Sequence, residues 1–231
     1  MASSQMLKVG VVLSAGGSAF FAALAKSGLP ADRFHIITDR PCQAEEYAKK
    51  TKLSHARISI KDRNTFSRHL REELIAAKCD IALLHFSRLV SDALFTEMPT
   101  FNVHPSFLPA YPGMNSVKEA ERDGAGFQGC TLHLVDAGMD TGPIVTRTAQ
   151  SLQTNAGLAW RKKISFGQKA LMTMALFDLV LAGRVDPSRI GLAAVDLSGT
   201  PFDYDVNHSF LNGTMATAAY ELWAEITRDC S

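Results

Sequence analysis

The sequence predicts an α/β fold in which a mostly parallel central sheet is flanked by helices. Short apolar segments alternate with segments of helical periodicity through the first half of the chain, which is typical of parallel strands joined by helices. A later pair of segments, 129–135 and 142–150, predicts neighbouring antiparallel strands. With 231 residues, 46% of them hydrophobic, the chain can bury a large core.

The first half of the chain begins with the apolar strand LKVGVVL at 7–13, followed by the tight loop SAGGS at 14–18 and a helix from about Phe20. The same alternation then continues along the sequence. It predicts a strand at 33–39, a helix at about 44–50, a strand at 54–58, a helix at about 62–78 and a strand at 80–85.

The second half holds the motif FNVH at 101–104, which we interpret as a further buried strand. Residues 105–113 contain three prolines and predict a structured loop, because proline removes a backbone donor. A short helix at about 116–122 and the antiparallel pair follow. A long amphipathic helix then runs from about Trp160 to Leu181 and ends at Gly183.

The tail beyond Asp186 has turn residues and aromatics but little periodicity, so we expect surface coil or short strands and a last helix near 216–227. No repeat or low-complexity linker divides the sequence. We therefore expect a single domain over 1–231, with a core at about 7–185 and a C-terminal extension at 186–231.

Charge and cysteine usage argue against several classes of function. The 24 basic and 23 acidic residues give a net charge of +1, so no strong field favours nucleic acid or an acidic membrane. Cys42, Cys79, Cys130 and Cys230 are scattered without a CxxC pair, which argues against disulfides and zinc. Neither a signal segment nor a run of ~18 apolar residues is evident. We expect a cytoplasmic monomer or homodimer that binds small molecules and no metal.

The loop at 14–18 lies where a strand passes into a helix. The amides of Gly16 and Gly17 could approach an anion there, aided by the positive helix terminus. The loop lacks the GxGxxG spacing, although Asp39 ends the next strand where a nicotinamide enzyme places its ribose-binding acid. The alternative is a glycine turn that serves only close packing of the helix on the strand.

Asn102 and His104 stand at the end of a buried strand, which is where open parallel sheets bind ligands. Being two residues apart, they point to the same face of the strand. They suit a reaction that develops negative charge on oxygen, because amide and imidazolium both donate hydrogen bonds. Asp140, in the turn GMDTGP, could orient the imidazole and favour its protonated form. The alternative is loop hydrogen bonds and a turn-capping aspartate.

Three segments carry a resemblance to a known family. NVHPSFLPAYPG at 102–113, GCTLHLVDAGMDTGPIV at 129–145 and VGVVLSAGGS at 9–18 together resemble the folate-dependent formyltransferases, most closely the glycinamide ribonucleotide transformylase branch. The resemblance covers about residues 7–185. It implies a Rossmann-like formyltransferase fold, 10-formyltetrahydrofolate as cosubstrate, a small amine as acceptor and a role in purine biosynthesis.

The resemblance also implies a mechanism and the residues that perform it. The acceptor amine attacks the formyl carbon, and His104 and Asn102 hold the oxyanion of the tetrahedral intermediate. Asp140 raises the pKa of His104 and helps to position a water that relays the proton. Thr131 occupies a supporting position beside them.

A donor pocket follows from the same resemblance. Arg63 matches an arginine associated with folate binding, and Arg88 matches the wall of the pterin pocket, with a surface salt bridge as its alternative role. The loop at 136–140 matches the segment that closes over the pterin. The predicted donor-binding residues are Arg63, Ser87, Arg88, Leu89, Val90, Asn102, Asp136, Ala137, Gly138, Met139 and Asp140.

The acceptor side departs from the family pattern. Ala19 stands in place of an asparagine that helps to hold the substrate phosphate, and Lys169 in place of a glutamate that contacts the ribose. Gly16, Gly17 and Ser18 still offer amides and a hydroxyl to an anion. The acceptor is therefore glycinamide ribonucleotide or another amine, such as an amino sugar or a hydroxyornithine-type siderophore precursor, with Lys169 available for an acidic group. A solvated surface lysine is the alternative for Lys169.

Three other functions fit parts of the sequence. A formyltetrahydrofolate deformylase, which is a hydrolase, uses the same three residues but normally carries an N-terminal regulatory domain, and the first strand here begins at about Leu7. A non-catalytic nucleotide-binding module would explain the glycine loop and Asp39, but not the arrangement of Asn, His and Asp. Methionyl-tRNA formylation would need a basic patch that this composition does not offer.

Overall fold

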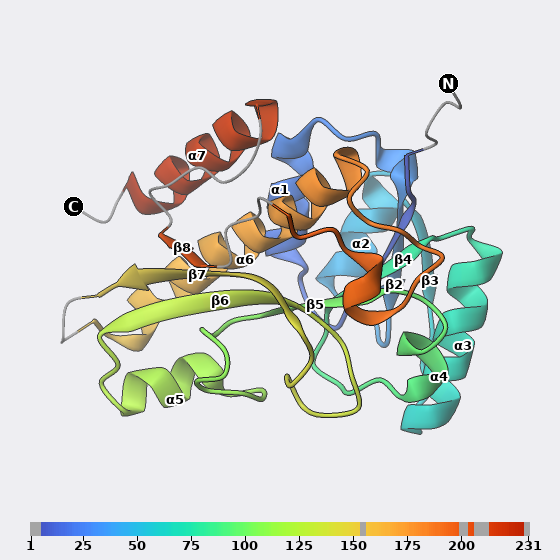
Figure 1. The fold of residues 1–231 in the computed structure, drawn as a ribbon, viewed down its shortest axis with the longest axis horizontal. Helices are drawn as coiled ribbons and strands as arrows, with labels where there is room; N and C mark the ends of the chain where they lie inside the picture. Colours follow the sequence, from blue (N-terminus) through green and yellow to red (C-terminus); the bar gives the residue numbers. More distant parts are fainter. Residues whose placement is uncertain (1–5, 153–155, 199–202, 206–212, 229–231) are drawn as a thin grey trace.

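The computed structural model describes residues 6–152, 156–198, 203–205 and 213–228, which form an eight-stranded sheet with helices around it (Figure 1). The strands lie in the order β3-β2-β1-β4-β5-β6-β7-β8. Their bounds are β1 Val9–Leu13, β2 Phe34–Thr38, β3 Ser54–Arg57, β4 Ile81–His85, β5 Thr100–His104, β6 Phe127–Leu134, β7 Ile144–Ser151 and β8 Asp203–Asp205. The α-helices are α1 Ser18–Ser27, α2 Gln43–Lys50, α3 Arg63–Ala76, α4 Asp92–Phe95, α5 Ser116–Arg122, α6 Leu158–Leu181 and α7 Gly213–Thr227.

Strand direction divides the sheet into two parts. β1 to β5 run parallel, whereas β6 is antiparallel to both β5 and β7, and β8 runs parallel to β7. The predicted parallel sheet with an antiparallel strand in the C-terminal half is therefore confirmed. The strand order reverses between β1 and β4, which are neighbours although β2 and β3 come between them in the chain. Such a reversal opens a crevice at the carboxyl ends of the strands.

Helices cover both faces of the sheet, so the core is divided in two. α1, α6 and α7 pack on one face, while α3 and α4 lie on the other (Figure 1). β1 contributes to both clusters, because Val11 and Leu13 point to the first and Val12 points to the second. The unbroken apolar run of β1 is thus explained by burial on both sides.

The long helix α6 differs from its prediction as an amphipathic helix, because it is buried on most sides. It packs against α1, α5, β6 and, on its outer side, α7 from the C-terminal tail. By length and hydropathy it is the one helix of the described ranges that could cross a membrane, yet 78% of its apolar window is buried inside the protein. The apolar character of α6 is therefore that of a core helix.

Smaller differences concern short elements and the tail. The sequence missed α4 and the 3-10 turns Ala31–Arg33 and Gly191–Ala194, since elements this short have no periodic signal. In the tail, β8 adds a short strand beside β7. α7 corresponds to the helix that the sequence predicted near 216–227. Cys42, Cys79 and Cys130 are free thiols, and Cys230 lies outside the described residues.

Candidate active site

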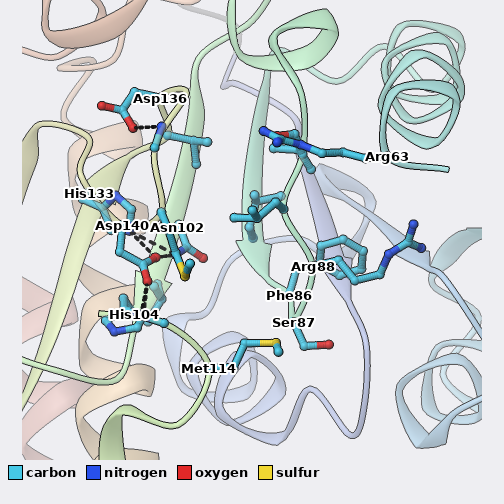
Figure 2. A pocket seen from close by; sticks show the side chains of 18 of the residues that line it. Arg63, Phe86, Ser87, Arg88, Asn102, His104, Met114, His133, Asp136 and Asp140 are labelled. Atoms are coloured by element: carbon cyan, nitrogen blue, oxygen red, sulfur yellow. Dashed lines mark hydrogen bonds and ion pairs between the residues drawn. The ribbon is translucent and has the colours of Figure 1, made fainter. Parts of the chain in front are cut away.

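A cavity of about 540 Å³ opens at the carboxyl ends of β4 and β5 (Figure 2). Polar side chains of β5, β6 and the loop after β6 form one wall, and the remaining walls are mostly apolar. Such a slot with a few convergent polar groups is typical of a small-molecule site. It is lined by Lys61, Arg63, Leu84, Phe86, Ser87, Arg88, Leu89, Val90, Asn102, Val103, His104, Pro105, Gly113, Met114, His133, Val135, Asp136, Gly138, Met139 and Asp140.

Strand pairing builds the polar wall. In the β5–β6 ladder, Asn102 lies opposite His133, and His104 lies opposite Thr131. Opposed residues of an antiparallel pair share one face of the sheet, and so do residues two apart on one strand. The register therefore brings four polar side chains from two strands onto one patch at the end of β5.

His104 is buried, and both of its ring nitrogens face acceptors. Its Nε2 lies 3.0 Å from the carbonyl oxygen of Tyr111, and its Nδ1 lies 3.3 Å from Oδ2 of Asp140. Burial lowers the pKa of His104 below its ordinary value, although the Asp140 carboxylate and the Tyr111 carbonyl raise it. Asp140 thus acts in the predicted direction, but the net shift of the pKa is the opposite, because desolvation of the imidazolium prevails.

Asp140 is held on a turn with a left-handed backbone, at a φ of 56°. Its Oδ2 accepts a hydrogen bond of 2.7 Å from the amide of Gly113, which ends the 105–113 loop. Burial raises the pKa of Asp140, but the nearby His133 ring, the charge of His104 and the Gly113 amide together bring it below the ordinary value. The carboxylate is therefore ionised at neutral pH, and it ties the proline-rich loop to the turn after β6.

Asn102 uses its amide hydrogens inside the protein. Its Nδ2 lies 3.0 Å from Nε2 of His133 and 3.4 Å from Oδ1 of Asp140. Because Nδ1 of His133 lies 2.9 Å from the carbonyl oxygen of Leu134 and donates to it, Nε2 of the neutral ring is an acceptor. The amide oxygen of Asn102 has no partner among the described residues and faces the cavity (Figure 2). Donation by Asn102 to an oxyanion, as predicted, therefore requires a half-turn of the amide.

Thr131 does not line the cavity but holds the loop that follows His104. Its buried hydroxyl donates to the carbonyl oxygen of Ser106 at 2.7 Å and accepts from the amide of Leu108 at 3.1 Å. Both partners belong to the loop that follows His104. Thr131 consequently fastens this loop to β6, next to its strand partner His104.

Arg88 lines the cavity, but its guanidinium points away from it (Figure 2). The guanidinium lies 4.5 Å from the centre of the Phe66 ring, donates to the Lys61 carbonyl oxygen at 2.8 Å and pairs with buried Asp39 at 3.5 Å. Asp39 also holds Arg40, so its carboxylate is already paired on both sides. The guanidinium of Arg88 thus forms an ion pair, which was the alternative to its predicted role in the pterin pocket. The rest of the residue forms part of the cavity wall.

Arg63 directs its guanidinium toward the cavity instead (Figure 2). It donates two hydrogen bonds, of 2.9 and 2.6 Å, to the carbonyl oxygen of Val90. With Lys61, it gives one end of the cavity two cations that can bind carboxylates. In the part of the chain that the structure covers, no three His, Cys, Asp or Glu side chains gather as a metal site.

The predicted residues separate into two groups in space. The donor-binding set lines the cavity, except for Ala137, which is exposed on the outside of the turn. Gly17 has a φ of 63°, and a Cβ there would lie 2.7 Å from Leu13, so turn geometry and packing alone require a glycine. Ala19 is buried in the core. The predicted acceptor residues that lie outside this cavity are Gly16, Gly17, Ser18, Ala19 and Lys169.

Sequence reasoning missed His133, which is the strand partner of Asn102. It lies two residues beyond Thr131 on the same strand, so the period of two would have placed it on the same face. Lys61 could have been predicted in the same way, because it is a second cation only two residues before Arg63. The apolar residues that line the cavity could not be predicted, because in the sequence an apolar residue at the end of a strand cannot be distinguished from a core residue.

Comparisons with known proteins agree with this geometry. Residues 7–157 match the family model described as formyl transferase. The chain is 32% identical over 154 residues to phosphoribosylglycinamide formyltransferase of Bacillus subtilis, covering 62% of this chain and 79% of that protein. It is 34% identical over 161 residues to the trifunctional purine biosynthetic protein adenosine-3 of Drosophila melanogaster, covering 64% of this chain but only 12% of that longer protein.

The fold comparison leads to the same family. The crystal structure of glycinamide ribonucleotide transformylase 1 from Symbiobacterium toebii superposes with a TM-score of 0.72 at 26% identity, covering 84% of this chain and 96% of that one. The resemblance inferred from the three sequence segments is thereby confirmed. This chain belongs to the formyl transferase family.

Proposed function

We propose that this chain transfers a formyl group from 10-formyltetrahydrofolate to the amino group of a small molecule, with glycinamide ribonucleotide as the reference acceptor. The observation that carries the proposal is the convergence of Asn102, His104 and Asp140 on one wall of an otherwise largely apolar cavity. Membership of the formyl transferase family supports the reaction, and relatives named phosphoribosylglycinamide formyltransferase support the acceptor.

The chemistry of the cavity suits the folate donor. Apolar side chains such as Phe86 and Val135 can cover a flat ring, and the backbone of 136–140 offers polar groups to its edge. Arg63 and Lys61 stand where they can bind carboxylates at the cavity end. When bound, the donor supplies an activated formyl carbon, and the residues of this chain orient it and exclude water.

His104 is positioned to stabilise negative charge on the formyl oxygen. Its Nε2–H is bonded to the neutral carbonyl of Tyr111, and a developing oxyanion is a stronger acceptor, so this hydrogen bond can exchange as the amine adds. Asp140 holds the other ring nitrogen and balances the charge of the imidazolium. Because both groups are largely withdrawn from water, their attraction is stronger than on the protein surface.

Asn102 orients the attacking amine in the arrangement described here. Its amide oxygen can accept an N–H of the amine, which directs the nitrogen lone pair toward the formyl carbon. A half-turn of the amide would offer an N–H to the oxyanion and would require a protonated His133, because Nε2 would then face an oxygen. The ionised Asp140 can hold a water that passes the amine proton to the leaving nitrogen.

The test incubates the purified protein with 10-formyltetrahydrofolate and a panel of amines that contains glycinamide ribonucleotide, amino sugars and hydroxyornithine. We expect formylated amine and tetrahydrofolate to appear in equal amounts. Formate released in the absence of any amine would identify a hydrolase instead. If neither product formed with any member of the panel, formyl transfer to these amines would be excluded.

A further inference from the structure

Lys169 has no partner for its positive charge in the part of the chain that the structure describes. It lies on α6 and is partly buried, and among the described residues none forms a hydrogen bond or an ion pair with its ammonium group. Burial lowers the pKa of Lys169. The titratable groups whose pKa values its charge lowers are His85 at the end of β4 and Cys130 on β6.

Neither neighbour offers a negative charge. Burial lowers the pKa of His85 to about 3 and raises the pKa of Cys130 to about 12, so the ring and the thiol are both neutral near pH 7. Withdrawing an ammonium group from water without a counter-ion is unfavourable. An anion from outside the protein would complete this environment.

His85 adds a second unsatisfied atom beside Lys169. The hydroxyl of Thr173 donates to the carbonyl oxygen of Lys169 at 2.8 Å, so it must accept from Nε2–H of His85 at 2.9 Å. The proton on Nε2 leaves a lone pair on Nδ1, to which no described residue donates. His85 and Lys169 are both half-buried, so each residue keeps some exposure to solvent.

This pair of side chains lies at the same edge of the sheet as the catalytic wall. His85 ends β4, and the residues at 86–90 that follow it line the donor cavity. Cys130 points to the face of the sheet that α6 covers, whereas His104 points to the opposite face. The two faces meet at the edge where β4 and β5 end with His85 and His104, so a small molecule that passes over this edge can reach both Lys169 and His104.

We infer that Lys169 and His85 form the acceptor subsite, and that the acceptor is an amine which also carries an acidic group, a carboxylate or a phosphate, paired with Lys169. Nδ1 of His85 accepts an N–H or O–H of the same molecule. The inference rests on the proposed formyl transfer, because it assigns the acceptor of that reaction. It favours acidic amines over neutral amino sugars.

The test uses two matched pairs of acceptors. The phosphate pair is glycinamide ribonucleotide and its dephosphorylated ribonucleoside, and the carboxylate pair is N5-hydroxyornithine and its methyl ester. Calorimetry measures the binding of each compound without the donor, and a separate assay measures formyl transfer. The variants are Lys169→Met, which keeps an apolar stem, Lys169→Arg, which keeps the charge, and Lys162→Met, which removes an exposed lysine of the same helix as a control.

We expect the native protein, Lys169→Arg and Lys162→Met to bind the acidic member of one pair about 10- to 100-fold more tightly than the neutral member. Lys169→Met should lose this preference, and the pair that shows it identifies the anion as phosphate or carboxylate. The same preference in Lys169→Met, or no preference in the native protein, overturns the inference. Binding that depends on Lys169 but is followed by no formyl transfer overturns the proposed function and leaves the subsite standing.

Discussion

The donor side and the acceptor side of the strand ends differ in how their polar groups are satisfied. On the donor side, His104, Asp140 and the amide hydrogens of Asn102 bond to other groups of the protein. On the acceptor side, the ammonium of Lys169 and Nδ1 of His85 have no partner among the described residues. Groups that are held in place before the reaction suit its repeated chemistry, whereas open groups suit a surface that the substrate completes.

Substitutions on the two sides should therefore have different effects. A change on the donor side breaks hydrogen bonds of the protein itself, so it should affect turnover, stability or both. A change on the acceptor side should alter only the choice of substrate, as expected for Lys169. Substitutions at four residues of the donor side, His104, Asp140, His133 and Thr131, test this distinction.

The largest effect is expected from removal of the catalytic groups. His104→Ala and Asp140→Asn should each lower kcat about 100- to 1000-fold, because each removes stabilisation of charge in the transition state. Steady-state kinetics with 10-formyltetrahydrofolate and the best acceptor measure the loss, and circular dichroism checks that each variant is folded. A kcat within threefold of the native value in either variant would contradict the proposed mechanism.

A smaller loss of turnover is expected from His133→Phe. Phenylalanine fills the space but leaves Nδ2 of Asn102 without the acceptor that orients it. An unsatisfied buried donor costs about 1–3 kcal/mol, which corresponds to about 10- to 100-fold in kcat if the cost falls on the transition state. His133→Gln serves as the matched variant, because its amide can restore a bond to Asn102 and should recover part of the activity. Equal kcat values in the two variants would argue against an orienting role for His133.

Thr131 tests the structural half of the comparison. Thr131→Val keeps the shape of the side chain but leaves the amide of Leu108 and the carbonyl of Ser106 unpaired, so unfolding by urea should show a loss of about 2 kcal/mol. Thr131→Ser keeps the hydroxyl and should lose less. Equal stability of the two variants would show that the hydroxyl does not hold the loop.

The most limited effect is a shift in the titration of His104. The carboxylate of Asp140 raises the pKa of His104 against the lowering effect of burial, so Asp140→Asn should lower this pKa further. The protonated ring is the form that stabilises an oxyanion, and its contribution is lost as the pH rises through the pKa. That loss should therefore begin at lower pH in Asp140→Asn than in the native protein. Nuclear magnetic resonance of the His104 ring measures the shift, and an unchanged or higher pKa would exclude it.

Patterns that are local in the chain could be predicted from the sequence. The apolar run of β1, the rigid loop at 105–113 and the shared face of Asn102 and His104 follow from spacing alone. The burial of α6 on most sides could not be predicted, because it depends on α7, which returns from the distant tail. The pairing of Asn102 with His133 required the β5–β6 register, which periodicity within one strand does not specify.

The sequence alone predicts the family, the mostly parallel sheet and the proximity of Asn102, His104 and Asp140, because motif residues at set spacings carry that information. The direction of the Arg88 guanidinium, away from the cavity, and the neutral neighbours of Lys169 are visible only in the folded protein. Hydrogen-bond direction, desolvation and the presence of a counter-ion depend on groups far apart in the chain, which become neighbours only after folding.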